Sequence, residues 1–187
     1  MSRLVWSINV SLDGVADHTV GVGVGDESYA FFSDLLDHTE LVVLGRVTYQ
    51  LMEAAWPNAQ KDPRATKRAI EFAEKFNAIP KMVFSRTLEK ADWNNTRLVR
   101  GDIVTEVARL KQELSKNILL DGLAVAQEFV RRRMIDEYWF VVHPILAGKG
   151  RRVFDNLNDG PILRFVNAIA FGSGAVALHY ENIENVH

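Results

Sequence analysis

The sequence contains no cysteine among its 187 residues. Disulfide bonds, thiolate metal sites and a cysteine nucleophile are therefore excluded, and such a composition is typical of a reducing compartment. No apolar run approaches the roughly 18–20 residues of a membrane-spanning helix. The N-terminal stretch also lacks the apolar core of a signal peptide. We therefore expect a complete cytoplasmic protein with no membrane partner.

The chain also lacks a strong excess of charge of either sign. It has 22 Lys and Arg against 24 Asp and Glu, a net charge of −2. A nearly neutral protein has no overall field that would attract nucleic acid, so we expect no nucleic-acid partner. The five histidines are scattered without an i, i+4 pair, which predicts no metal site. Length and a hydrophobic content of 48% favour one domain, residues 1–187.

Hydrophobic periodicity predicts an alternation of strands and helices. Strands are expected at 3–10, 40–45, 81–85, 96–99, 117–122, 136–144, 162–171 and 175–183. Helices are expected at 26–38, 62–79, 102–114 and 123–134. Strand–helix–strand units build a mainly parallel sheet with helices on both faces. A Gly-Ser-Gly turn at 172–174 then predicts an antiparallel C-terminal hairpin.

Functional residues are expected where the parallel strands end, because ligands bind beyond the carboxyl ends of such strands. The segment LVVLGRVTY (41–49) is an apolar strand that stops at Gly45 and delivers Arg46 and Thr48. Guanidinium and hydroxyl groups match phosphate oxygens, and a following helix N-terminus adds backbone donors. Taken alone, however, such a segment is usually a solvated turn.

The same chemistry recurs after the next strand, in Ser85, Arg86 and Thr87. A third turn, 121–124, has a glycine before its helix. Three such turns on one edge favour a ligand with several phosphates. A dinucleotide with a 2′-phosphate fits, because no acidic residue follows the second strand to hold a free ribose hydroxyl. The G-x-G-x-x-G fingerprint is absent after the first strand, so an ordinary Rossmann domain is not expected.

Several stretches along nearly the whole chain resemble the dihydrofolate reductase fold. Within that fold they are similar to the reductase domain of the bifunctional riboflavin-biosynthesis deaminase-reductases. The matching stretches are VSLDG (10–14), VVLGRVTY (42–49), AWP (55–57), VFSRTL (83–88), WNNTRLV (93–99), MIDEYWFVVHPILAGKGRRVF (134–154) and SGAVALHY (173–180). The resemblance implies a three-layer α/β domain. The deaminase part of those enzymes has no counterpart here.

The resemblance also implies an activity, namely NADPH-dependent reduction of a pyrimidine- or pterin-like heterocycle, and a homodimer. The implied cofactor-binding residues are Gly45, Arg46, Thr48, Ser85, Arg86, Thr87, Asp121, Gly122, Leu123 and Ala124. Asp13 is a candidate catalytic and substrate-binding carboxylate that would orient the heterocycle, although Asp-Gly is also a common turn. Trp56 is a candidate wall of the substrate pocket, with core packing as the alternative.

One departure from the family pattern bears on function. Asp121 stands where family members commonly have glycine, and its charge beside phosphates is expected to weaken cofactor binding unless the side chain points away. A non-catalytic nucleotide-binding or sensor module is therefore an alternative. A true dihydrofolate reductase is a further alternative, in which Asp34 or Asp37 would have to supply the acidic group on the first long helix.

Overall fold

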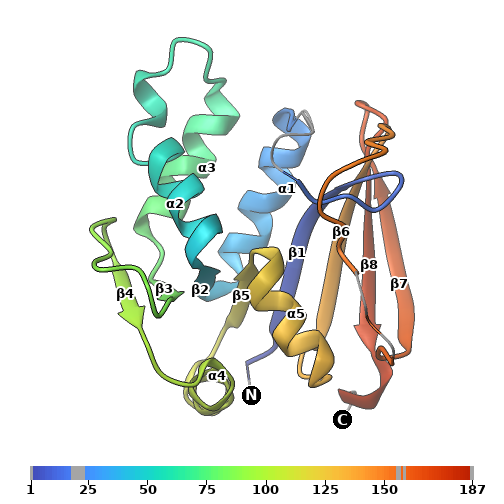
Figure 1. Ribbon diagram of the computed structural model, residues 1–187. Helices are drawn as coiled ribbons and strands as arrows, with labels where there is room; N and C mark the ends of the chain where they lie inside the picture. Colours follow the sequence, from blue (N-terminus) through green and yellow to red (C-terminus); the bar gives the residue numbers. More distant parts are fainter. Residues whose placement is uncertain (1, 18–23, 155–156, 158, 186–187) are drawn as a thin grey trace.

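A computed structural model describes residues 2–17, 24–154, 157 and 159–185. Its strands form one sheet in the order β4-β3-β2-β5-β1-β6-β8-β7, from β4 on the left to β7 on the right in Figure 1. The strands are β1 (Leu4–Ser11), β2 (Thr39–Gly45), β3 (Lys81–Phe84), β4 (Thr96–Val99), β5 (Asn117–Asp121), β6 (Glu137–His143), β7 (Leu163–Ala170) and β8 (Val176–Asn182).

The pairing confirms the predicted sheet. Along the sheet, the six strands β4, β3, β2, β5, β1 and β6 pair in parallel with one another. Only the C-terminal hairpin of β7 and β8 introduces antiparallel pairs. The turn between these two strands contains Gly174 at φ +86°, a backbone conformation that glycine adopts without strain.

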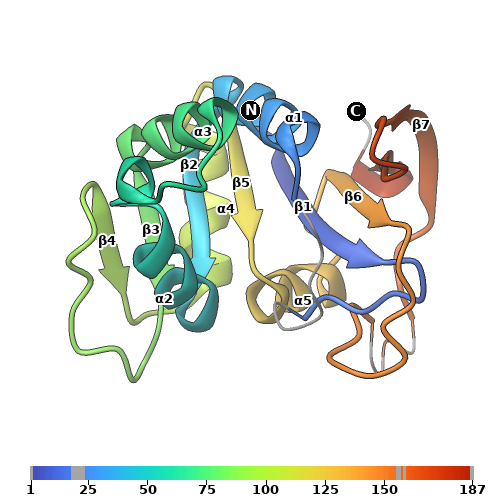
Figure 2. The same cartoon turned by 90° about the horizontal axis from the view of Figure 1, so that it is seen from above.

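The helices form a layer on each face of the sheet, as Figure 2 shows from above. They are α1 (Asp26–Asp37), α2 (Arg46–Ala55), α3 (Lys67–Ala78), α4 (Ile103–Glu113) and α5 (Leu123–Arg131), with 3₁₀ turns η2 (Ala59–Lys61) and η3 (Ile183–Asn185). One core cluster joins α4 and α5 to the sheet, and a second joins α1, α2 and α3 to it. β2 lies between these clusters, which explains its uninterrupted apolar run.

Two helices differ from the sequence prediction. α2 was not assigned a range from the sequence, and Tyr49 is its one fully buried residue. α3 begins at Lys67 rather than at 62, because Thr66 accepts a hydrogen bond from the Ala69 N–H and so caps the helix there. The Asp62-Pro63 pair that suggested the earlier start lies in the preceding turn, where Asp62 accepts from the Arg64 N–H.

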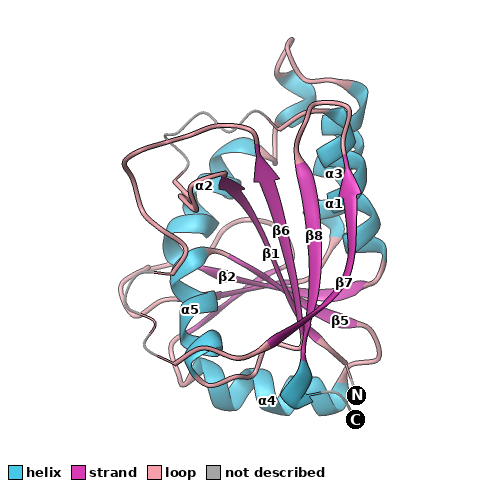
Figure 3. Ribbon diagram, turned by 90° about the vertical axis from the view of Figure 1, so that its right-hand side faces the viewer, coloured by secondary structure: helices cyan, strands magenta, loops and turns pink. Residues whose placement is uncertain are grey.

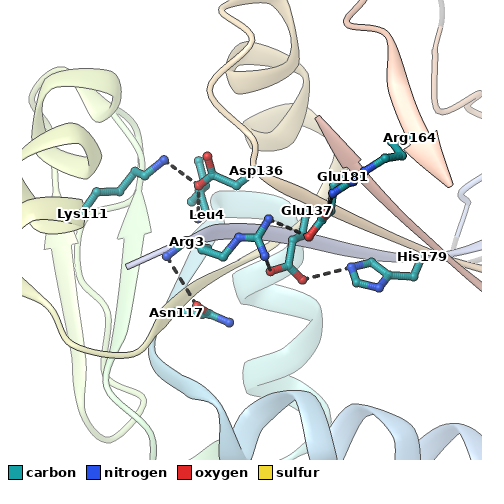
Figure 4. Close-up of polar contacts among 9 residues, drawn as sticks. All are labelled: Arg3, Leu4, Lys111, Asn117, Asp136, Glu137, Arg164, His179 and Glu181. Atoms are coloured by element: carbon teal, nitrogen blue, oxygen red, sulfur yellow. Dashed lines mark hydrogen bonds and ion pairs between the residues drawn. The ribbon is translucent and has the colours of Figure 1, made fainter. Parts of the chain in front are cut away.

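A buried carboxylate fixes the amino end of the sheet (Figure 4). Asp136 precedes β6 and accepts hydrogen bonds from the Leu4 N–H at 2.6 Å and the Lys111 ammonium at 2.5 Å. It thereby connects β1, α4 and β6. A second group of charges, also drawn in Figure 4, links Arg3 to Glu137 and Glu181 at 2.8 and 2.9 Å.

We predict that Asp136→Ala lowers the free energy of unfolding by about 3–5 kcal/mol, because it leaves the buried Leu4 N–H and the largely buried Lys111 ammonium without their carboxylate partner. The control is Asp159→Ala, which removes an ion pair with Arg133 whose Asp159 side chain is 84% exposed. That change should cost no more than about 1 kcal/mol. Urea denaturation of both variants measures the difference, and equal losses would contradict the anchoring role of Asp136.

Candidate active site

Three candidate segments meet at one edge of the sheet. Gly45 at the end of β2 pairs with Phe84 of β3, and Leu44 pairs with Asp121 of β5. The residues that follow these strand ends, including Arg46 and Arg86, therefore share the carboxyl edge as the sequence predicted. Figure 2 shows β2 and β5 ending side by side where α2 and α5 begin.

The turns before α2 and α5 pack directly against each other. Gly122 has φ +116°, and a Cβ atom there would lie 2.4 Å from the Thr48 hydroxyl oxygen. A Cβ atom at Gly45 would lie 2.7 Å from Val125 on α5. The two turns approach so closely that neither position has room for a side chain. This packing also brings the N-termini of α2 and α5 near one another.

These two helix N-termini are left available to an anion. Neither α2 nor α5 has a side-chain cap or an acidic residue in its first turn among the described residues. By contrast, Thr66 caps α3 and Asp102 caps α4. Uncapped N–H groups and the positive ends of two helix dipoles favour phosphate oxygens at this edge.

The segment GRVTY owes its geometry to Tyr49. This buried side chain donates a hydrogen bond to Glu53 at 2.6 Å and accepts one from the Trp93 N–H at 3.1 Å. Burial raises the pKa of Tyr49 to about 12, so the phenol keeps its proton. Tyr49 thus attaches α2 to the loop after β3.

The polar side chains of the edge are accessible. Arg46 is exposed and donates to Gln50 at 3.1 Å. Arg86 and Thr87 are exposed, while Ser85 accepts from the N–H groups of Thr87 and Leu88 and so shapes the turn. The guanidinium of Arg100 also supports this turn by donating to the carbonyls of residues 86 and 89.

A pocket of about 180 Å³ opens beside this edge, between the sheet and the layer of α1 and α3. Its wall is mostly aromatic and aliphatic. The lining residues are Ser7, Ile8, Asn9, Val24, Tyr29, Phe32, Leu36, Met52, Trp56, Phe72, Phe76, Leu119 and Asp121. A cavity of this composition suits a largely apolar ligand that is oriented by a few polar groups.

Trp56 lines this pocket, and it also packs in the core. Its ring lies 5.0 Å from that of Phe72 and 6.1 Å from that of Tyr29, centroid to centroid. The two interpretations of Trp56 are therefore compatible. Neither Asp34 nor Asp37 lines the pocket: Asp34 is exposed on α1, and Asp37 pairs with Lys75 at 2.6 Å.

The side chain of Asp121 does not face the turn where cofactor phosphates were expected. Its side chain lines the aromatic pocket together with Leu119, two residues earlier on the same face of β5. Gly122, not Asp121, makes the close contact with Thr48. The carboxyl group therefore points into the pocket, and the predicted repulsion of cofactor phosphates loses its geometric basis.

Two further polar residues of the pocket come from β1. Ser7 and Asn9 are two residues apart, so they lie on one face of the strand. The Asn9 side-chain oxygen lies 2.8 Å from His143 Nε2. Burial lowers the pKa of His143, which favours the neutral ring. The sequence signal for these residues was present, since they interrupt an otherwise apolar strand.

Asp13 occupies a different place. Its carboxylate accepts hydrogen bonds from the Ser11 hydroxyl at 2.7 Å and from the N–H groups of Ala147 and Gly148 at 2.9 and 2.8 Å. These bonds, the Ser11 hydroxyl first, hold the pKa of the Asp13 carboxyl well below its usual range. Asp13 is not among the pocket-lining residues. These contacts favour an anchor for the loop after β6 over a substrate ligand.

Groups of three or more His, Asp or Glu suited to a metal ion do not occur in the described part of the chain. None of the helices formed by the described residues is long and apolar enough to span a membrane.

The fold defines a class: an α/β domain of the dihydrofolate reductase type, in which β2, β3 and β5 end at one edge of the sheet. The model of the RibD C-terminal domain family matches residues 3–177, and the chain belongs to that family. It is also similar to the uncharacterized protein YyaP of Bacillus subtilis. The two are 28% identical over 182 residues, covering 95% of this chain and 94% of YyaP.

Two solved structures illustrate the likeness of fold. One is a diaminohydroxyphosphoribosylaminopyrimidine deaminase/5-amino-6-(5-phosphoribosylamino)uracil reductase from Thermotoga maritima, with TM-score 0.66 and 16% identity over 97% of this chain and 56% of that one. The other is dihydrofolate reductase from Enterococcus faecalis in complex with NADP(H) and RAB-propyl. Its TM-score is 0.65 with 13% identity, over 97% of this chain and 96% of that one.

We predict that Gly122→Ala destabilises the protein more than Gly14→Ala. Gly14 has φ +80°, and a methyl group at this position would have no atom within 4 Å, so alanine there adds only backbone strain of about 1–3 kcal/mol. Alanine at Gly122 adds a clash with Thr48 to comparable strain. Thermal unfolding of both variants checks this, and equal shifts of Tm would contradict the close contact between the two turns.

Proposed function

We propose that the protein is an NADPH-dependent reductase that transfers a hydride to a pyrimidine- or pterin-like heterocycle, of the 5-amino-6-(5-phosphoribosylamino)uracil reductase type. The observation that carries this proposal is the continuity of two features. Two uncapped helix N-termini lie at closely packed glycine turns, and β5, whose Leu119 and Asp121 line the aromatic pocket, ends at one of these turns. A phosphate-rich tail and a flat ring therefore have adjoining places.

The residues present fit a pyridine dinucleotide. Gly45, Gly122, Leu123 and Ala124 would bring backbone donors to its pyrophosphate, with the Thr48 hydroxyl beside them. Arg46, Ser85, Arg86 and Thr87 would meet the 2′-phosphate, because a guanidinium and neighbouring hydroxyls match its oxygens. When bound, reduced nicotinamide supplies the hydride. The protein's own task is to hold the ring and the substrate in register and to exclude water from the pocket.

A nucleotide sensor without catalysis remains the competing function on this fold. Its main support was the charge of Asp121 beside phosphates, and the position of this side chain in the pocket removes that support. Tryptophan fluorescence during NADPH titration measures binding, and loss of NADPH absorbance with candidate pyrimidines and pterins measures turnover. Turnover favours the reductase, whereas binding without turnover on the whole set favours the sensor.

We predict that Arg86→Ala and Arg46→Ala weaken NADPH binding by about 10–100-fold, the loss expected for a charge-assisted phosphate contact. NADH lacks the 2′-phosphate, so its Kd should change by no more than about 3-fold. Fluorescence titration with both nucleotides measures the ratio. Arg68→Ala, at an exposed arginine of α3, is the control. Equal losses of affinity for NADPH and NADH would show that Arg46 and Arg86 do not contact the 2′-phosphate.

We also propose a homodimer that forms through the edge strand β7. Phe165, Val166 and Ile169 of this strand are 56%, 41% and 41% exposed. Figure 3 views the sheet from this side, with β7 as the outermost strand next to β8. An edge strand with exposed apolar side chains favours pairing with another chain, and a two-fold axis would bury the same patch on both copies.

We predict that Phe165→Glu converts the dimer to a monomer, because two buried carboxylates would face the partner surface without a counter-charge. Light scattering after size-exclusion chromatography measures the mass. Leu146→Glu is the control, since Leu146 is 73% exposed and lies outside β7. A wild-type monomer, or a Phe165→Glu dimer, would contradict this interface.

A further inference from the structure

One polar side chain of the pocket is held by a residue outside the pocket. Asn9 lies on β1 and lines the pocket, and its side-chain oxygen lies 2.8 Å from Nε2 of His143. His143 ends β6, which pairs in parallel with β1. Asn9 pairs with Val141, two residues before His143, so the two side chains lie on one face of the sheet. His143 is therefore placed to set the orientation of the Asn9 amide.

The hydrogen bond between these side chains has two possible directions, and each gives the pocket a different group. If Nε2 of His143 carries the ring proton, it donates to the Asn9 oxygen, and the amide nitrogen of Asn9 with its two hydrogens is turned away from the ring. If the proton is on Nδ1, Nε2 can only accept, and the amide must be reversed. The tautomer of His143 therefore decides whether Asn9 offers a ligand a donor or an acceptor.

The surroundings of His143 favour the proton on Nε2. The side chain is 4% exposed, and burial lowers the pKa of His143, so the ring is neutral at pH 7 and carries one proton. Among the described residues, Nε2 has the Asn9 oxygen as its partner and Nδ1 has none. A buried N–H group without an acceptor is costly, so the proton belongs on Nε2. The amide nitrogen of Asn9, which has no partner in the described part of the chain, is then available to a ligand.

We propose that Asn9 determines which heterocycles the pocket accepts, by donating its amide N–H to an oxygen or an unprotonated nitrogen of the ring, and that His143 is the positioning residue that holds the amide in this orientation. The inference rests on the proposed reductase function and narrows its substrate class. A carbonyl group of the ring satisfies the donor, whereas an amino group at the same place brings two donors together. The pocket therefore selects oxo-substituted rings over their amino counterparts.

The other polar groups of the pocket do not make this choice. The hydroxyl groups of Ser7 and Tyr29 can donate or accept, so they suit either kind of ring. The carboxyl group of Asp121 can also do both, because burial raises its pKa to about 7 and both protonation states occur near neutral pH. Asn9 differs from these three residues, because its unpaired group can only donate.

The first test identifies the tautomer of His143 without cofactor or substrate. In protein labelled with ¹⁵N-histidine, the chemical shifts of the two ring nitrogens distinguish a protonated from an unprotonated nitrogen. The pair of resonances that is missing from His143→Gln should show a proton on Nε2. His38→Gln, at an exposed residue, is the control and should leave that pair in place. A ring whose only proton is on Nδ1 would overturn the proposal, because the oxygen of Asn9 would then be the group available to a ligand.

The second test compares two flat probes of the same shape, pteridine-2,4-dione and 2,4-diaminopteridine, which carry carbonyl and amino groups at the same positions. Tryptophan fluorescence measures Kd for both in protein saturated with NADP⁺, so that no hydride is transferred. Asn9→Leu should weaken binding of the dione about 5–50-fold, because its carbonyl loses its donor, while Kd of the diamino compound changes no more than about 3-fold. Asn94→Leu, at an exposed residue, is the control and should leave both Kd values unchanged.

A double-variant cycle separates positioning by His143 from simple packing. His143→Leu removes the donor to the Asn9 oxygen and leaves the amide free to rotate, so the preference for the dione should fall. The same change should have no effect on the preference in protein that already carries Asn9→Leu, because the amide is then absent. His143→Gln keeps an N–H donor and should restore most of the preference. Losses that add in the double variant would overturn the positioning role. Circular dichroism confirms folding, and the tautomer measurement decides the point if His143→Leu does not fold.

The outcomes distinguish this inference from the proposed function. Equal losses on both probes in Asn9→Leu, or no loss on either, would overturn the role of Asn9 in selecting the ring. Wild-type protein that binds NADP⁺ but neither probe would overturn the narrowed substrate class and leave the cofactor site standing. Failure to bind NADP⁺ would overturn the proposed function, and with it this inference, whatever the tautomer of His143.

Discussion

The parallel pairing of β5 with β1 on one side and β2 on the other is the constraint on which the site depends. Leu120 pairs with Trp6 and Val43, and the next residue along β5 is Asp121. Because all three strands run in one direction, their polar ends meet at a single edge. A shift of one residue in β5 would turn Asp121 to the opposite face and bury it against α5.

The two ends of the sheet have opposite chemistry. At the amino end, the Asp136 carboxylate accepts from Leu4 and Lys111, so that its charge is compensated inside the fold. At the carboxyl end, the N-termini of α2 and α5 have no side-chain cap among the described residues, and Asp121 has no polar partner there. The paired charges therefore lie at the end of the sheet where no ligand is expected. The helix N–H groups without a side-chain cap lie at the other end, where a bound ligand could accept their hydrogen bonds.

The sequence predicted the parallel sheet, the C-terminal hairpin and the shared edge of Arg46 and Arg86, because these follow from local patterns and from the chirality of strand–helix–strand units. It did not predict α2, whose position depends on the long-range bonds of Tyr49 to the loop after β3. The sequence also did not decide whether Asp13 belongs to a turn or to the substrate site. The partners of Asp13 at Ala147 and Gly148 are 134 and 135 residues away, a distance that no local pattern reports.

Asp121 shows how alternation along a strand decides which side of the sheet a residue faces. The family resemblance placed Asp121 in the turn beside the cofactor phosphates, where its negative charge was expected to weaken binding. In β5, however, Leu120 belongs to the core cluster under α4 and α5, and Leu119 to the one under α1, α2 and α3. Asp121 shares the side of Leu119, so the glycine after it faces the turn while the carboxyl enters the pocket. Two neighbouring residues therefore contribute to two different features of this edge, the packed turn and the pocket.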